Sequence, residues 1–467
     1  MQYFEIAEES LQKVIRQGMS LGADYVDIFL QHSASTVVNL STEGNATASQ
    51  NITYGAGVRV VSGEKNGYVY TEQISPESLS AAVVQAARIC QGAQPTAFVQ
   101  HCQAPLPSNL YPAQNLTFQP DGTQIDLMVR YLKQMQEELR QRDQRIVAAS
   151  CSVRNVTSRV AIANSISPTL EEMQPMTTVL LNGVISNNGQ TESANCSRSL
   201  RRQLDMLTDE LRADIETQVL DKLHFALEAQ QPKGGEMPVV MAPGASGILL
   251  HEAIGHAFEA DFIRRGESIF TDRLGQQICD PAITVVDDGL LPDMRGSIHF
   301  DDEGVPAQTT EIVSEGRLNS FLHDRISARH FGVEPTGNGR RENFRSIPCP
   351  RMRNTYMRGG SGSEQDLIAD VRQGIYVKDF CNGQVQIGAG DYTFYVKSGY
   401  LIENGRLTQP IKDINVIGNG PQTLADIKAV AGKTVIDPSC WVCGKEGQSM
   451  SVSCGMPSVL VSRLTVG

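Results

Sequence analysis

The sequence predicts an α+β protein, with helices in its N-terminal and middle regions and a β-rich C-terminal domain. Segments with apolar residues at helical spacing concentrate in the first half of the chain. Strand-like runs separated by glycine-rich turns dominate its last third. The 467 residues are too many for one small core, and a prior of about 150 residues per domain gives roughly two to four domains.

The N-terminal region, residues 1–100, is predicted to be an α+β domain. Residues 4–23 carry apolar side chains at helical spacing, which indicates a first helix. Residues 24–41 alternate and are rich in β-branched side chains, as is typical of a strand, and two more strands are expected after them. A second helix is expected after Ser75, which can cap it, with Pro76 at the first helical position.

The middle region, residues 101–232, is predicted to be a second α+β domain with a linker. Residues 92–115 are rich in proline and lack periodicity, which is typical of a connection between domains. Helices are expected near residues 126–143 and 207–229, with strand-like runs between them. The segment "QQPKGGEMP" is expected to mark the next boundary.

Residues 233–467 are predicted to form a β-rich C-terminal domain that holds a metal. The run "PVVMAPG" is expected to be a short buried strand, and "ILLHEAIGHAFEADF" follows it almost at once. Strand-like runs and glycine-rich turns continue to the last segment, "PSVLVSRLTVG". The histidine-containing segment therefore precedes most of the predicted strands of this domain in the sequence.

Composition excludes some classes of function. A net charge of −12 and the lack of a basic stripe argue against nucleic-acid binding. The acidic start "MQYFEIAEES" does not resemble a signal peptide, and no apolar run reaches the ~18 residues of a membrane helix. A cytoplasmic protein is expected, whose ten cysteines are mostly reduced and buried.

The segment "HEAIGH" indicates a metal site with unusual spacing. His251 and His256 are five residues apart, and so they would lie about 140° apart on a regular helix. They can bind one ion only if the helix is locally distorted, for example by a π-bulge, and Gly255 would tolerate such a distortion. The alternative is a chance pair on a solvated helix, but the apolar residues around the histidines favour a buried pair.

A third ligand must come from outside this pair. Glu259, Asp261 or a distant cysteine could supply it, and "CWVC" holds Cys440 and Cys443. The two cysteines could also be buried free thiols or a redox pair. The redox hypothesis is weaker, because no helix start follows the motif to lower a thiol pKa.

Several blocks together resemble the TldD branch of the TldD/PmbA family of metalloproteases. They are "GVRVVSGEKNGYVYTEQIS", "LLHEAIGHAFEADF", "PTGNGRRENF" with "PRMRNTYM", "GYLIENGRLTQPI", "IGNG" and "CGKEGQ". The resemblance implies that His251, His256 and Cys443 bind a zinc ion. It also implies that Glu252 acts as general base or acid in peptide hydrolysis. Cys440 has no counterpart in this pattern.

The resemblance also implies a substrate and a partner. The substrate would be an unfolded or extended peptide, processed or degraded without strong sequence preference. The partner would be a TldE/PmbA-like subunit in a heterodimer, or a second copy of this chain in a homodimer. The PmbA-like branch lacks the histidine motif, so this chain is expected to be the active type.

Two further hypotheses complete the predictions. Arg340 and Arg341 follow the turn "PTGNG" and could bind a carboxylate of the peptide, or they could be solvated residues on a surface turn. A non-catalytic regulatory protein, of the type labelled modulator of DNA gyrase, is the alternative function. An acid beside the histidines has no obvious purpose in such a protein, so we expect an enzyme.

Overall fold

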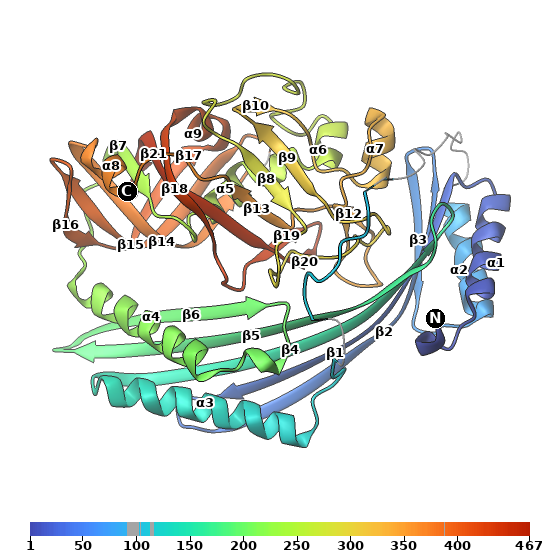
Figure 1. The fold of residues 1–467 in the computed structure, drawn as a ribbon, viewed down its shortest axis with the longest axis horizontal. Coiled ribbons are helices and arrows are strands. Elements are labelled where there is room, and N and C mark those ends of the chain that lie inside the picture. The colour runs from blue at the N-terminus through green and yellow to red at the C-terminus, as the bar shows by residue number, and fades with distance from the viewer. Residues whose placement is uncertain (91–101, 103, 113–115, 387) are drawn as a thin grey trace.

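The computed structural model describes residues 1–90, 102, 104–112, 116–386 and 388–467. The predicted α+β class is confirmed, because helices cover a first sheet and a second, larger sheet fills the C-terminal region (Figure 1). Most of the linker predicted at 92–115 lies outside the described residues.

The first sheet is antiparallel throughout and has the strand order β3-β2-β1-β4-β5-β6. Its central strands β1, β2, β4 and β5 are unusually long, and the sheet that they form is strongly curved (Figure 1). The bounds are β1 Tyr25–Leu40, β2 Ala46–Ser62, β3 Lys65–Thr71, β4 Ile146–Asn164, β5 Leu170–Asn187 and β6 Gln190–Leu200.

Two pairs of helices cover the same face of this sheet, at opposite ends of its strands. Val26, Ile28 and Leu30 of β1 pack into the hydrophobic cluster of α1 and α2, whereas Val38 and Leu40 pack into that of α3 and α4. Side chains alternate between the two faces of a strand, so all five point to one side. The bounds are α1 Glu8–Ser20, α2 Pro76–Ile89, α3 Gly122–Arg142 and α4 Asp209–Glu228, with short helical turns η1 Gln2–Phe4 and η2 Leu204–Met206.

The predicted start of α2 is confirmed. The side chain of Ser75 accepts a hydrogen bond from the backbone N–H of Ser78, and Pro76 is the first helical residue.

Across the boundary predicted near residue 100, strand β1 pairs with both β2 and β4, so the two sides share one sheet. Each side nevertheless has its own helix pair and its own hydrophobic cluster, and the division into domains stays a prediction.

The C-terminal region is built around a closed ring of strands. β21 pairs with β17, β17 with β15, β15 with β14, β14 with β7, and β7 pairs again with β21. Four strands extend the sheet from β21 in the order β13, β8, β9 and β10, while β16 and β18 pair alongside. The bounds are β7 Gly235–Met241, β8 Val285–Asp288, β9 Thr309–Ser314, β10 Arg317–Leu318, β13 Asn354–Met357, β14 Gln373–Val385, β15 Asp391–Glu403, β16 Arg406–Ile411, β17 Ile414–Asn419, β18 Ile427–Ile436 and β21 Ser453–Val466.

Short helices and two small sheets complete this region. The helices are α5 Gly247–Leu250, η3 His251–Gly255, η4 His256–Phe258, α6 Ala260–Arg264, α7 Arg325–Phe331, α8 Glu364–Ala369 and α9 Gly420–Asp426. The two-stranded sheets are β11 Gly339–Arg340 with β12 Cys349–Pro350, and β19 Val442–Lys445 with β20 Gln448–Ser451. The whole region lies over the concave side of the first sheet (Figure 1).

Close backbone packing fixes the segment that carries the histidines. At Gly247, which begins α5, a Cβ atom would lie 2.4 Å from the backbone nitrogen of Gly455 in β21. At Gly420, which begins α9, a Cβ would lie 2.0 Å from the carbonyl oxygen of Ala253. Neither neighbour is the mobile end of a side chain, so the histidine segment is held from both sides by contacts that only glycine permits.

We expect the substitution Gly247→Ala to destabilise the protein by about 1–3 kcal/mol, the usual cost of an added methyl group in a tightly packed interior. Chemical denaturation would measure the loss of free energy of unfolding. Gly122→Ala is the matched control, since Gly122 opens α3 with nothing within 4 Å of the added carbon. A Gly247→Ala protein as stable as the control would show that the contact with β21 is looser than described.

Among the residues that the structure describes, every helix is too short or too polar to span a lipid bilayer.

Candidate metal centre

The helix that carries "HEAIGH" is distorted between the two histidines. Residues His251–Gly255 form a π-helical turn, between the α-helical turn of α5 and the 3₁₀ turn of η4. The wider π turn brings residues five apart onto one side of the helix, as the sequence spacing required. The distortion predicted from the spacing is therefore present.

Gly255 has a different role from the one its sequence context suggested. Its φ of −59° and ψ of −48° are ordinary right-handed helical values, which any residue can adopt. A Cβ at this position would instead lie 2.4 Å from the sulfur of buried Met352. The glycine is therefore explained by close packing, and the interpretation as a conformational need was wrong.

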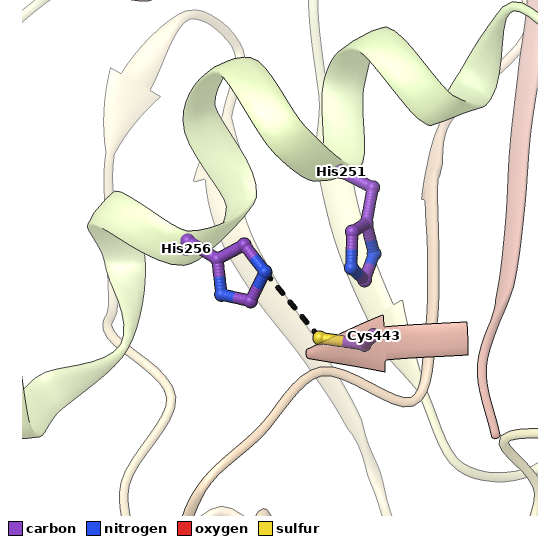
Figure 2. Close-up of side chains that lie close together, drawn as sticks. All are labelled: His251, His256 and Cys443. Atoms are coloured by element: carbon purple, nitrogen blue, oxygen red, sulfur yellow. Dashed lines mark hydrogen bonds between the residues drawn. The ribbon is translucent and has the colours of Figure 1, made fainter. Parts of the chain in front are cut away.

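Three side chains from distant parts of the chain meet beside this turn. His251 and His256 point from the helix toward Cys443 of β19 (Figure 2). The possible ligand atoms of the three residues all lie within 4.8 Å of one another, and His256 Nε2 lies 3.3 Å from Cys443 Sγ. All three residues are buried. The structure thus brings together the residues predicted to bind the metal.

The donor set fits a zinc ion. Both ring nitrogens of His251 are buried, and neither has a hydrogen-bond partner within the described protein. Buried polar atoms are rarely left without a partner, so an ion at this point would satisfy one of them. Two imidazoles and a thiolate are typical zinc donors, and three protein ligands leave one position open for a water or a substrate.

The electrostatics also favour a ligand form of the cysteine. Burial by itself would raise the pKa of the Cys443 thiol, but the His256 and His251 imidazoles hold that pKa well below its usual value. Burial likewise opposes the charge on His256, yet Glu259 and Cys443 raise the pKa of its imidazole well above the ordinary range. A thiolate is the form of cysteine that binds a metal.

Glu259 orients His256. Its carboxylate accepts a hydrogen bond of 2.9 Å from His256 Nδ1, which leaves Nε2 directed at Cys443. Lys445 lies 3.1 Å from the same carboxylate and 2.7 Å from Asp261. Burial opposes the charge on Glu259, but Lys445 and His256 lower the pKa of its carboxyl to about 2. Glu259 is thus a carboxylate that fixes the ring of His256, and Lys445 pairs with both Glu259 and Asp261.

We expect Glu259→Gln to weaken metal binding by about 10- to 100-fold, the usual effect of removing the acceptor behind a metal-bound histidine. Competition with a chromophoric chelator would measure the affinity. Glu267→Gln serves as the control, because Glu267 is exposed and, among the residues that the structure describes, its ion pair is with Arg265 beside it. Unchanged affinity in a folded Glu259→Gln protein would contradict the assigned role.

Glu252 lies beside the candidate ligand His256. One of its carboxylate oxygens is 4.0 Å from His256 Nε2, and the side chain is 22% exposed. Unlike the three buried candidate ligands, it therefore reaches both the ligand atoms and solvent. A carboxylate in this position can accept a proton from a water held next to the ligand atoms.

Arg340 and Arg341 are buried and do not lie on a solvated surface turn. Both are only 3% exposed, so that alternative from the sequence is wrong. Arg340 donates to the carbonyl oxygens of Met352 and Ser451, and Arg341 pairs with Asp27 at 3.2 Å. Both nevertheless line a cavity of about 390 Å³, and their predicted role in substrate binding stays a prediction.

Other parts of the site were not foreseen from the sequence. Arg351 donates a hydrogen bond of 2.6 Å to the carbonyl oxygen of Cys443. Lys445 forms ion pairs with both Glu259 and Asp261. Their only signal was their position inside the "PRMRNTYM" and "CGKEGQ" blocks. Cys440 lies apart from the group, and its backbone N–H donates to Ser197. The described cysteines are all free thiols.

Comparison with known proteins decides the family. Residues 234–467 match the model of the PmbA/TldA metallopeptidase C-terminal domain, and residues 26–90 match that of domain 1. A metalloprotease TldD homolog from Haemophilus influenzae is 36% identical over 454 residues, which cover 95% of this chain and 93% of that protein. The chain belongs to the PmbA/TldD metallopeptidase family. It is a metallopeptidase, as the resemblance had implied.

A further relative resembles the chain in sequence, and solved structures resemble it in fold. A zinc metalloprotease TldD homolog from Saccharolobus solfataricus is 31% identical over 61% of this chain and 63% of that protein. A Thermotoga maritima protein described as a modulator of a DNA gyrase shares the fold, with a TM-score of 0.79 and 20% identity over 98% of this chain and all of that one. TldE from Thermococcus kodakarensis gives a TM-score of 0.75 and 18% identity, again over 98% and 100%.

Proposed function

We propose that this metallopeptidase uses a zinc ion, bound by His251, His256 and Cys443, to hydrolyse unfolded or extended peptides. The observation that carries the proposal is the meeting of these three buried donors across a π-helical turn. The name of the Saccharolobus relative supports zinc as the metal. Two neutral imidazoles and one thiolate would leave a site charge of about +1 with Zn²⁺.

The residues of this site would divide the reaction between them. The bound zinc ion would supply a Lewis acid for the scissile carbonyl and lower the pKa of a water. Glu252 would take a proton from the attacking water and return it to the leaving amine. Glu259 keeps His256 in place, and Lys445 holds Glu259 by its charge. Arg351 fixes the backbone at Cys443.

An extended substrate fits the strand that carries Cys443. β19 and β20 pair only with each other among the described strands, so each has an edge free of a third strand. Main-chain hydrogen bonds to such an edge bind a peptide with little regard for its sequence. A folded protein could not offer its backbone in this way, which would restrict cleavage to unfolded segments.

We further propose that the chain works as a dimer, with a TldE/PmbA-like subunit or with a second copy of itself. The fold shared with TldE supports this, because related folds can form pseudosymmetric pairs. Peptide cleavage is therefore tested both with the chain alone and with the chain mixed with such a subunit.

Removal of the metal tests the proposal. Treatment with a chelator is expected to abolish cleavage of an unfolded peptide, and one equivalent of zinc per chain is expected to restore it. Elemental analysis of the purified protein gives the stoichiometry. Cleavage that persists in protein shown to be metal-free would refute the function. A purified active protein that holds a different metal at full occupancy would refute the choice of zinc.

A further inference from the structure

A cavity of about 390 Å³ lies between the first sheet and the C-terminal region. On one side it is lined by Arg154, Val156 and Ser158 of β4, which point away from the helices on the other face of that sheet. On the other side it is lined by Val442 of β19 and by Ser451 of β20. Val442 directly precedes the candidate ligand Cys443, so the cavity and the candidate metal centre share one hairpin.

The lining concentrates positive charge in a chain that is acidic as a whole. Five arginines and two carboxylates line the cavity: Arg154, Arg201, Arg295, Arg340 and Arg341, with Asp302 and Glu342. The whole chain has a net charge of −12, so this concentration is local. Like charges gathered at one cavity repel each other, and an anion between them relieves that repulsion.

Four of these arginines lack an ionic partner. Within the described part of the chain, no carboxylate oxygen lies within 4.0 Å of a guanidinium nitrogen of Arg154, Arg201, Arg295 or Arg340, whereas Arg341 pairs with Asp27. Three of these four charges, on Arg201, Arg295 and Arg340, are also poorly solvated, because the side chains are buried. Burial lowers the pKa of Arg295 to about 10; the Cys440 thiol opposes this shift, and repulsion from Arg201 and Arg154 adds to it. An arginine that is buried without a counter-charge is uncommon in proteins.

The cavity remains connected to solvent and to the hairpin of the candidate metal centre. Arg154 is exposed, and its one side-chain hydrogen bond runs to Ser35 at 3.3 Å. At the other end Arg295 donates to the carbonyl oxygen of Trp441 at 3.0 Å and to Ser451 at 3.2 Å. A chain bound along the hairpin could therefore place an anionic group among the arginines.

We propose that this arginine cavity binds a carboxylate group of the peptide substrate, beside the candidate metal centre. Arginine binds carboxylates through two parallel hydrogen bonds, and a peptide carries a carboxylate at its C-terminus or on an acidic side chain. This inference rests on the proposed function for the identity of the ligand. It adds a preference for peptides with a carboxylate near the bond that is cut.

Direct binding tests the proposal without relying on hydrolysis. The probes are three peptides of one unfolded sequence, each carrying the uncharged fluorophore nitrobenzoxadiazole: a neutral C-terminal amide, the same peptide with a free C-terminal acid, and the amide with one internal glutamate. Their affinities for the full-length Glu252→Gln protein are measured by fluorescence anisotropy. We expect at least one of the two carboxylate peptides to bind about tenfold or more tightly than the neutral amide, and the better one identifies the source of the carboxylate.

Variants locate the effect in the cavity. Arg154→Gln lies at the exposed end and should fold normally, and it is expected to reduce the advantage of the carboxylate peptide at least threefold. Arg295→Gln should remove most of that advantage if the variant keeps its native circular dichroism. Arg145→Gln is the control, because Arg145 is an exposed arginine that pairs with Asp143 far from the cavity. Its affinity for all three peptides should match that of the parent protein.

Two outcomes would overturn the proposal. One is equal affinity for the three peptides in a folded protein. The other is a carboxylate advantage that survives unchanged in Arg154→Gln and in a folded Arg295→Gln protein. Peptide cleavage that persisted in metal-free protein would refute the proposed function but would leave these binding results standing, so the two proposals can fail separately.

Discussion

The Cys443→Ala protein is expected to lose its metal and, with it, peptide cleavage. Cys443 supplies the only thiolate of the candidate site and lies within 4.8 Å of both histidine donors. Loss of a residue behind a ligand already weakens metal binding by 10- to 100-fold, so loss of the ligand should weaken it by more than about 100-fold. Two buried imidazoles alone would leave two protein ligands where a catalytic zinc site usually has three.

Metal content after gel filtration and the rate of peptide cleavage together measure this effect. Cys440→Ala is the matched control, because Cys440 is three residues away and contacts Ser197 instead of the histidines. The control should keep about one metal ion per chain. A Cys443→Ala protein that retained the metal with unchanged affinity would mean that the third ligand is another residue.

The second large effect is expected from Glu252→Gln, which should keep the metal and lose the reaction. The amide has the shape of the carboxylate but cannot accept the proton of the attacking water. General acid–base groups contribute about 10²- to 10⁴-fold to rates, so kcat should fall by that factor, or by about 3–5 kcal/mol of transition-state stabilisation. KM should change little, because the carboxylate acts on the water and not on substrate binding.

Steady-state kinetics and metal analysis on the same preparation separate the two quantities. Glu228→Gln provides the control, since it removes one exposed negative charge at the end of α4. A Glu252→Gln protein with full metal content and undiminished kcat would exclude Glu252 as the base. A protein that lost the metal as well would instead place Glu252 among the ligands.

Local rules were reliable where a feature depends on neighbours in the sequence. Ser75 and Pro76 predicted the start of α2, and residues 126–143 and 207–229 predicted most of α3 and α4. One of the strand-like runs expected between these two helices, residues 175–193, proved to be parts of two strands, β5 and β6, joined by a tight turn at Asn188 and Gly189. Both residues have positive φ, which the alternation of apolar side chains did not reveal.

In the candidate site, too, some features could be predicted from the sequence and others could not. The separation of His251 and His256 required a distorted helix if both residues were to bind one ion, because a regular helix turns the two side chains apart. The choice among Glu259, Asp261 and a distant cysteine could not be made from spacing. It depended on the resemblance to a family, and the structure now places Cys443 beside the histidines and Glu259 behind one of them.

The sequence by itself determined the class of fold, the long helices α1 to α4 and, for histidines that share one ion, a distorted helix, because these follow from the geometry of neighbouring residues. Only the tertiary structure decided that β7 closes a ring with β21 and that Lys445 reaches Glu259 and Asp261. It also gathered arginines from β4, from the C-terminal region and from the segments between them around one cavity. Such contacts join residues more than 100 positions apart, and their formation depends on how whole sheets pack.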